Sequence, residues 1–344
     1  MSGQATIDQA VDEAALGSWL EGNVEGFLGP FELTKFTWGQ SNPTYRIAAA
    51  SGDYVLRRKP FGPLLPSAHA VDREYRLIAA LHPLDFPVPR PFASCEDPDV
   101  IGAIFYVMEF ARGRAYTDGA LPEFDPATRR SMYEQLVDTL ADLHVIDPDA
   151  ADLSDFGKSG NYFERQVMRW TRQYRDSQTD YIPEVERLIA FLPESLPQQS
   201  RTSIVHGDYR IDNVMFDGDG TLTAVLDWEL ATLGDPLADF SYLAMQWMMP
   251  ADGGAGLAGL DVRALGIPSL DEIGERYSAR SGVPVADQLD WYFAYNLFRL
   301  TGIVQGIKKR VIDGTASSAK AAEMAARVPM LASAAWSFAM KAGA

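Results

Sequence analysis

The chain has 344 residues, of which 47% are hydrophobic, and its 47 acidic against 30 basic side chains give a formal net charge of −17 at pH 7. Length and hydrophobic content predict a globular protein large enough for two lobes, at roughly 100 to 200 residues per domain. The acidic balance disfavours nucleic acid or an anionic membrane as a partner, because both are bound through Lys and Arg clusters that release counterions.

The first third of the chain is predicted to form a smaller lobe of short strands. We expect a helix over residues 8–28, then about five strands and one helix up to about residue 110. Residues 36–47 fit a strand, a tight turn and a second strand. Taken alone, this segment could equally be an ordinary hairpin.

Residues 54–60, with the sequence YVLRRKP, predict another strand of this lobe. Its alternation puts Val55, Arg57 and Lys59 on one face. The segment AVDREYRLIAAL that follows predicts a helix, which carries Glu74. Either cation of the strand could be a solvated charge at the edge of the sheet.

A hydrophobic strand over residues 104–110 runs into a polar turn, and a buried strand alone would account for this pattern. Beyond a linker that contains Gly and Pro, residues 127–146 place apolar side chains at helical spacing, which predicts a core face. The remainder of the chain is expected to be mainly helical, with long helices over residues 286–312 and 316–341.

Residues 161–176 predict a helix with Arg165, Arg169 and Arg172 on one face. A solvated stripe of arginines is the plainer interpretation. The alternative is a wall that binds an anion, since guanidinium groups meet phosphates and carboxylates through bidentate contacts.

Residues 204–230 are the most informative segment: a strand, a polar loop, a strand, a turn and a third strand. Asp208 is followed five positions later by Asn213, and Asp227 closes the last apolar run. This pattern suits transfer of a γ-phosphoryl group, in which a protein mainly positions groups and neutralises charge. Asp208 would orient a hydroxyl acceptor and take its proton. Asn213 and Asp227 offer the oxygen ligands that Mg²⁺ prefers.

Other interpretations of this segment are weaker. Asp and Asn are common in turns, so the spacing could arise by chance. A two-metal hydrolase centred on His206 would need more ligands than the four histidines of the chain allow. We expect His206 to be a buried brace for the loop. Further on, Asp235 fits a helix N-cap with Pro236 at the first helical position.

The segment HGDYRIDN, with LDWE downstream, resembles the catalytic loop and metal-binding strand of the aminoglycoside phosphotransferase family of small-molecule kinases. Protein kinases write this loop as H-R-D-x-x-x-x-N with the same spacing. Gly207 stands where they have an arginine that reads a phosphorylated activation loop, which argues for an enzyme that is always assembled. The segments LRRKPFGPLLPSAHAVDREYR and LDWELATLGDPLADF resemble a subgroup similar to the kinase-like region that eukaryotes fuse to acyl-CoA dehydrogenase domains.

The resemblance implies an α+β, protein-kinase-like fold of two lobes. Residues 1–111 would form a nucleotide-binding lobe around a small antiparallel sheet. Residues 112–344 would form a larger, mainly helical lobe for catalysis and acceptor binding. Either Asp235 or Asp239 would fix the backbone of the catalytic loop, and Asp235 is preferred.

The resemblance also implies ATP and Mg²⁺ as cofactors. Arg57 aligns with the lysine that holds the nucleotide phosphates and would pair with Glu74, and Lys59 is the alternative cation. Met108 would form the back wall of the adenine pocket. The other expected nucleotide contacts are the covering loop, at Gly39, Ser41 and Asn42, and the hinge backbone, at Glu109, Phe110 and Ala111.

The predicted function is that of a small-molecule kinase, a phosphotransferase with an alcohol group as acceptor. The subgroup implies a hydroxyacyl-CoA or related acid as that acceptor, whereas an acidic cleft would suit an aminoglycoside. A nucleotide-binding pseudokinase scaffold, or a transferase or hydrolase that reuses the fold, is the alternative. The single cysteine, Cys95, the lack of an apolar run of about 18 residues and the lack of a signal peptide predict a cytoplasmic protein, either a monomer or a homodimer.

Overall fold

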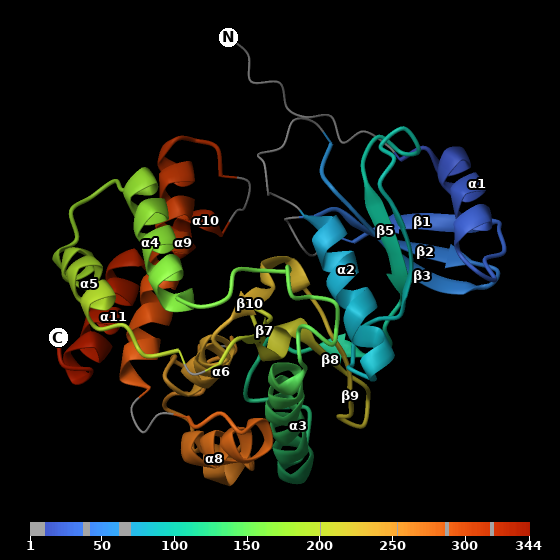
Figure 1. Ribbon diagram of the computed structural model, residues 1–344. Helices are drawn as coiled ribbons and strands as arrows, with labels where there is room; N and C mark the ends of the chain where they lie inside the picture. The colour runs from blue at the N-terminus through green and yellow to red at the C-terminus, as the bar shows by residue number, and fades with distance from the viewer. Residues whose placement is uncertain are drawn as a thin grey trace. The chain divides into compact units, whose positions relative to one another are not determined.

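The computed structural model describes residues 11–36, 42–61, 70–199, 201–252, 254–285, 289–316 and 320–344. Its contacts divide the chain into two compact units, whose elements are labelled in Figure 1. The N-terminal unit contains Met1–Ala115, Ala151–Leu153 and Asn213–Ala231, and the C-terminal unit contains Tyr116–Ala150, Ser154–Asp212 and Thr232–Ala344. The sequence predicts one boundary, after residue 111, whereas the contacts also group the hairpin that follows the polar loop with the N-terminal unit.

The N-terminal unit is built on a five-stranded antiparallel sheet in the order β1-β2-β3-β5-β4. Its strands are β1 (Phe31–Lys35), β2 (Thr44–Ala49), β3 (Gly52–Arg58), β4 (Pro91–Cys95) and β5 (Phe105–Glu109). Its helices are α1 (Glu13–Asn23), α2 (Val71–Leu81), and the short 3₁₀ turns η1 (His82–Leu84) and η3 (Trp228–Leu230). A smaller sheet joins β6 (Arg114–Ala115), β8 (Val214–Phe216) and β9 (Leu222–Val225).

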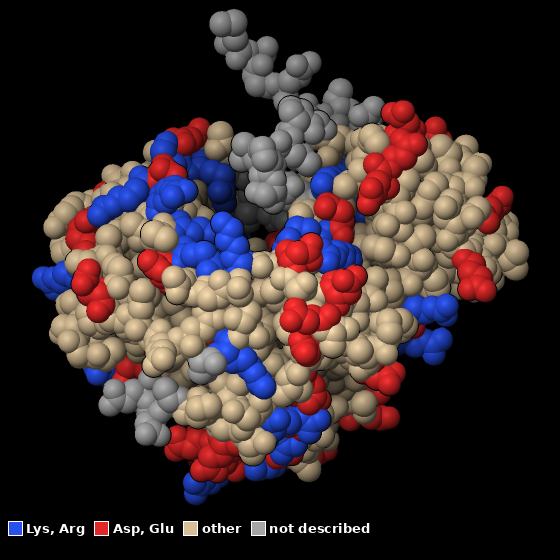
Figure 2. Space-filling model, in the orientation of Figure 1, with Lys and Arg blue, Asp and Glu red and all other residues tan. Residues whose placement is uncertain are grey.

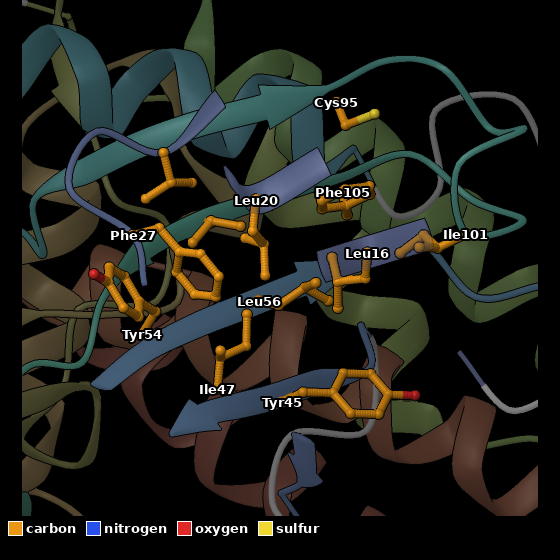
Figure 3. Close-up of a cluster of buried hydrophobic side chains, with 12 residues drawn as sticks. Leu16, Leu20, Phe27, Tyr45, Ile47, Tyr54, Leu56, Cys95, Ile101 and Phe105 are labelled. Carbon is orange, nitrogen blue, oxygen red and sulfur yellow. The ribbon is translucent and has the colours of Figure 1, made fainter. Parts of the chain in front are cut away.

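Alternation along β3 decides what each face of the sheet meets. Tyr54 and Leu56 pack in an apolar cluster with Leu16 and Leu20 of α1 (Figure 3). Full burial of one such leucine stabilises the fold by roughly 1.5–3 kcal/mol. Arg57, the residue after Leu56, lies on the opposite face and reaches α2. The core that α1 completes therefore fixes which β3 side chains face α2.

Helix α1 is shorter than the expected helix over residues 8–28. It begins after Asp12, whose carboxylate accepts the first free amides of the helix. It ends at Asn23, and Val24 and Phe27 beyond it pack into the sheet cluster. These apolar residues extend the helical pattern in the sequence, but in the structure they pack against the sheet.

The C-terminal unit is mainly helical. Its helices are α3 (Pro126–Val145), α4 (Tyr162–Ser177), α5 (Pro183–Glu194), α6 (Leu237–Ala244), α7 (Val262–Leu265), α8 (Leu270–Ser281), α9 (Asp290–Ile312), α10 (Ala321–Ala325) and α11 (Val328–Lys341). The short elements are β7 (Ser203–Val205), which pairs with β10 (Thr232–Gly234), and the 3₁₀ turns η2 (Ile211–Asn213) and η4 (Met245–Trp247). Helix α9 is central and packs against α4, α6, α10 and α11 (Figure 1).

One helix expected over residues 316–341 is two helices in the structure, α10 and α11. Pro329, in the first turn of α11, lacks an amide hydrogen and restricts the residue before it, so a helix starts here more readily than it continues. Within the described ranges, none of the helices has the length and apolar character needed to cross a membrane.

Candidate active site

The loop that carries Asp208 is held through its backbone inside the C-terminal unit. The carboxylate of Asp239 on α6 accepts the amides of His206, at 2.5 Å, and Gly207, at 2.8 Å. Arg299 on α9 donates to the carbonyl of Gly207 at 2.7 Å. Asp239 and Arg299 are both buried. The backbone leading to Asp208 is therefore fixed by protein groups, which is the preorganisation that phosphotransfer needs.

Gly207 has a φ of 83°. Residues with a side chain are strained in this left-handed region, and glycine is not. The local geometry of the loop is therefore sufficient to explain glycine at the position where protein kinases have arginine.

The prediction that Asp235 fixes this loop is wrong, because Asp239 does so. Asp235 accepts the amide of Leu237 at 2.9 Å and so stays at the start of α6. The helix begins at Leu237, with Pro236 as its cap, one residue later than predicted. A side chain that turns toward the amides of its own helix is not free to reach another segment, whereas Asp239 lies further along α6. Burial raises the pKa of Asp235 to about 6, against the opposing effect of its hydrogen bond from Leu237.

Further buried side chains support the loop from α3 and α8. The Nε2 atom of His144 lies 3.4 Å from the Asp239 carboxylate, and its Nδ1 atom lies 2.6 Å from the hydroxyl of Tyr277. The hydroxyl of Tyr209 donates to the carbonyl of Leu136 at 2.9 Å. These contacts join the loop to the core of the unit, and sequence inspection gave no sign of them.

His206 is fully buried, and its Nδ1 atom accepts the amide of Asp208 at 3.2 Å, the contact expected of a brace. Asp208 itself is half-buried. Burial raises the pKa of Tyr242, and the nearby charge of Asp208 adds to this effect. The charge of Asp208 is also among the causes that raise the pKa of Arg210 and the pKa of Arg299. The carboxylate is thus surrounded by groups that can orient it and a partner.

Asn213 and Asp227 lie at one end of the β8–β9 hairpin in the N-terminal unit. Val214 pairs with Val225 in this hairpin, as predicted. The amide of Leu226 donates to the carbonyl of Asn213 at 2.8 Å, which places Asp227 directly beyond this pair. Asp227 has a φ of 65°. Such strain at a residue other than glycine is concentrated at functional sites.

Arg57 is the centre of an ion-pair cluster in the N-terminal unit. Its Nε atom lies 3.0 Å from Glu74, and its Nη2 atom lies 2.9 Å from Asp227 and 3.7 Å from Glu229. Burial raises the pKa of Glu74 to about 7, Arg57 opposes this, and the charges of Asp227 and Glu229 add to it. Burial would lower the pKa of Arg57, but Glu74, Tyr106 and Asp227 raise it above its ordinary value. One guanidinium among three carboxylates leaves this cluster with a net negative charge.

The predicted pairing between a strand cation and the α2 glutamate is present for Arg57. Lys59 pairs with Asp72 instead, at 3.1 Å. Arg58, on the other face, is 1% exposed and donates to the carbonyl of Lys59 and the hydroxyl of Tyr45. The three consecutive cations therefore have three different sets of partners, and the contacts of Arg58 stabilise the fold.

The expected hinge residues follow the end of β5. Met108 is buried, and Glu109 is the last residue of β5 in the ladder with β3. Phe110 and Ala111 lie beyond that ladder, so the sheet does not use their backbone groups. Of the residues expected in the covering loop, Asn42 is buried. The other two, Gly39 and Ser41, lie outside the described residues.

The arginines of α4 divide into two pairs. Arg165 donates to two carbonyls of the preceding loop, one at 2.6 Å, and Arg175 pairs with α5 at 2.5 Å. Arg169 and Arg172 are exposed and form no ion pair with the residues that the structure describes. Figure 2 shows Lys and Arg side chains gathered over α4. Of the three arginines predicted to share one face, Arg169 and Arg172 are therefore the two that an anion could contact.

The donor set of the hairpin fits Mg²⁺. In the described part of the chain, no three His, Cys, Asp or Glu side chains converge as a metal site would require. Asn213 and Asp227 provide one amide and one carboxylate, and the Asp227 side chain is 37% exposed. Mg²⁺ takes few protein oxygens and completes its shell with water and nucleotide phosphates. A closed structural zinc site would need four ligands.

The α+β fold is that of the protein-kinase-like phosphotransferases. A model of the phosphotransferase enzyme family matches residues 32–274. The chain belongs to this family, and its α+β fold is that of the aminoglycoside phosphotransferases.

The chain is 44% identical over 338 residues to mouse acyl-CoA dehydrogenase family member 10, covering 97% of this chain but 32% of that protein. The chain thus spans about a third of the length of this relative. A solved structure from Ralstonia eutropha JMP134, assigned provisionally to the aminoglycoside phosphotransferases, is 44% identical, with a TM-score of 0.89 over 96% of this chain and 99% of that one. Spectinomycin phosphotransferase APH(9)-Ia, solved with ADP and spectinomycin, is 13% identical, with a TM-score of 0.63 over 95% and 99% of the two chains, and shares the fold alone.

Proposed function

We propose that the chain is a small-molecule kinase that uses Mg²⁺ and ATP to phosphorylate a hydroxyl group, and that its acceptor is a hydroxyacyl-CoA or a related acid. The observation that carries the proposal is the state of Asp208, a half-buried carboxylate on a loop whose backbone Asp239 and Arg299 hold. A carboxylate on a backbone that is fixed in this way keeps one position, as a base that orients an acceptor hydroxyl must.

The proposed mechanism gives separate tasks to Asp208, to Arg57, and to Asn213 with Asp227. Asp208 accepts a hydrogen bond from the acceptor hydroxyl and takes its proton as the oxygen attacks the γ-phosphorus. The bond from that phosphorus to the bridging oxygen breaks, and ADP leaves. Arg57, oriented by Glu74, holds phosphate oxygens of the nucleotide. Asn213 and Asp227 would hold Mg²⁺, which neutralises charge on the phosphate oxygens when bound.

The acceptor part of the proposal rests on Arg169 and Arg172. Both are exposed on α4 and have no ion-pair partner among the described residues. Polycationic antibiotics would be repelled by such a face, whereas the phosphates of a coenzyme would be attracted to it. The names of the longer relatives, acyl-CoA dehydrogenase family members, are consistent with an acyl-CoA as the molecule handled.

Coupled ADP release from the purified chain with Mg·ATP tests the proposal, with a panel of hydroxyacyl-CoAs and kanamycin-like aminoglycosides as acceptors. We expect turnover that depends on a hydroxyacyl-CoA and is absent from the Asp208→Ala variant, whose affinity for ATP should stay within a few fold. Turnover on aminoglycosides alone would replace the acyl-CoA assignment. The absence of ADP release with every acceptor, in a protein that still binds nucleotide, would favour the pseudokinase scaffold.

A paired variant tests the arginine contacts. Replacing Arg169 and Arg172 together by Ala should raise the KM for the acyl-CoA by roughly tenfold, an effect that salt should mask in the wild type. The KM for a truncated acyl thioester without phosphates should not change. Arg175→Ala is the matched control on the same helix, because Arg175 pairs with Glu186. Equal KM values in all three proteins would make the stripe a solvated surface.

A further inference from the structure

The C-terminal unit contains a cavity of about 340 Å³ beside the loop of Asp208. Arg210, two residues after Asp208, and Tyr242 of α6 both line it. Both side chains interact with the charge of Asp208. The cavity is therefore adjacent to the proposed catalytic base within the same unit. Ligand pockets run from roughly 300 to 1,000 Å³, so this one suits a chain or a small group.

The charges that line the cavity cancel. Arg210 forms an ion pair with Asp212, and Arg327 forms one with Asp252 at 3.2 Å. The side chains of the second pair are 44% and 54% exposed, so this pair is at the solvent side. A polycation would need several unpaired carboxylates here, and a phosphate would need an unpaired cation. The lining offers neither.

The interior of the cavity is apolar. Side chains from η4, α9 and α11 form its buried wall: Met245, Val304 and Leu331. Met249 and Leu300 are half-buried and line it too. Unbranched methionines adapt to irregular apolar ligands more readily than stiffer side chains do. This surface suits a hydrocarbon chain.

Gln246 is the exception in this apolar wall. It lines the cavity, it is 4% exposed, and neither its amide nitrogen nor its amide oxygen has a hydrogen-bond partner among the described residues. A buried polar group without a partner has lost its hydrogen bonds to water and gained none in return, so such groups are usually paired. An amide that faces a cavity can regain a hydrogen bond from a polar group of a ligand.

We propose that this cavity binds the acceptor chain and that Gln246 determines its specificity, by hydrogen bonding to the one polar group of an uncharged, mainly apolar chain. The inference rests on the proposed function and deepens it, because it names the part of the acceptor that enters the C-terminal unit. Any charged part of the same molecule stays outside, since the cavity has no unpaired charge to meet it.

Calorimetry without nucleotide tests the inference separately from catalysis. The probes are butanoyl, hexanoyl and octanoyl N-acetylcysteamine thioesters, each with and without a hydroxyl group on the chain, and kanamycin. We expect affinity to rise with chain length and the hydroxylated octanoyl probe to bind more tightly than kanamycin. Failure of every thioester to bind, or tighter binding of kanamycin, would overturn the inference.

Gln246→Met removes the amide and keeps a flexible side chain of similar size. We expect it to weaken binding of the hydroxyoctanoyl probe roughly tenfold, with a melting temperature no lower than that of the wild type, because a buried unpaired group is lost. Gln305→Met is the matched control. Gln305 is also buried, but it donates to Ser177 and Thr179 and does not line the cavity. It should lower the melting temperature and leave probe affinity unchanged.

Unchanged probe affinity in Gln246→Met would overturn the role of Gln246 and assign its partner to water. The outcomes also separate the inference from the proposed function. Thioester binding without ADP release on any acceptor would retain the cavity as a chain-binding site and reject the kinase. ADP release with an acceptor in the absence of thioester binding would retain the kinase and reject the cavity.

Discussion

The loop of Asp208 and the hairpin of Asp227 hold their carboxylates by different means. Around Asp208, buried side chains bind the backbone, and the main contacts are Asp239 and Arg299 to Gly207. Asp227 is held through its own carboxylate, by Arg57 at 2.9 Å. A backbone clamp fixes the position from which the Asp208 side chain extends, whereas the ion pair engages the Asp227 carboxylate itself. The first arrangement suits a base with one fixed position, and the second suits a ligand whose partners change when nucleotide and metal bind.

The largest expected effect separates the two regions. Asp227→Ala should lower the Mg²⁺-dependent affinity for ATP about 100-fold or more, which corresponds to about 2.7 kcal/mol. Asp208→Ala should change that affinity by no more than a few fold, because the proposed role of Asp208 is to contact the acceptor and not ATP. Calorimetric titration with ATP, in Mg²⁺ and in EDTA, measures both. If Asp227→Ala keeps the Mg²⁺-dependent part, the metal is bound elsewhere and the comparison fails.

Asp239→Asn tests the backbone clamp. One amide oxygen cannot replace two carboxylate oxygens, so one of the two loop amides would face another donor inside the protein. We expect a loss of stability of about 2–4 kcal/mol and a fall in kcat of roughly 100-fold, with ATP affinity little changed. Denaturant unfolding and steady-state kinetics measure these changes. A stable variant with normal kcat would mean that the loop keeps its geometry without the clamp.

The contacts of Arg57 and of the Asp227 hairpin could be predicted from the sequence because local rules define them. Strand alternation places Arg57 on the face toward α2, and the helical segment that follows carries Glu74. The hairpin around its Gly- and Asp-rich turn brings Asn213 close to Asp227 along one ladder. The two-residue alternation of a strand and the short separation of these residues in the sequence were enough to predict these contacts.

The clamp could not be predicted in the same way. Asp235 and Asp239 lie four residues apart, and the sequence favours the first because it has the pattern of a helix cap. Only the folded structure shows that the Asp235 carboxylate accepts an amide of its own helix, whereas Asp239 faces the loop. Arg299 is 92 positions from Gly207, and no local pattern in α9 marks it. Contacts of this kind depend on the tertiary fold.

The role of Asp235 in stability gives a pH test. Its folded pKa, about 6, is above the ordinary value of 3.8, so the folded state binds the proton more tightly than the unfolded state. Stability is therefore greatest below about pH 4 as far as this group is concerned, falls by about 3 kcal/mol as the pH rises to about 6, and is level above that. Asp235→Asn should remove this fall, because its amide oxygen can still accept the Leu237 amide and it carries no charge.

Denaturant unfolding of the wild type and Asp235→Asn between about pH 4 and pH 8 measures the difference. Glu74 also has a raised pKa, but it titrates in both proteins and cancels in the comparison. The variant should become the more stable protein as the pH rises through about 5 to 6. If the two plots of unfolding free energy against pH are parallel, ionisation of Asp235 does not destabilise the folded state. Normal kcat in the variant at neutral pH would agree with its place outside the clamp.

The smallest effect tests which cation, Arg57 or Lys59, would hold the phosphates of the proposed nucleotide. Arg57 spans Glu74 and Asp227 through two different nitrogens, and a lysine has one ammonium group that cannot reach both at these distances. Arg57→Lys should therefore raise the Kd for Mg·ATP roughly tenfold and leave the KM of the acceptor unchanged. Lys59→Ala is the matched control from the same strand face, because Lys59 pairs with Asp72 at 3.1 Å and should alter Kd by less than a few fold. A larger loss from Lys59→Ala than from Arg57→Lys would reverse the assignment and make the Arg57 cluster a structural one.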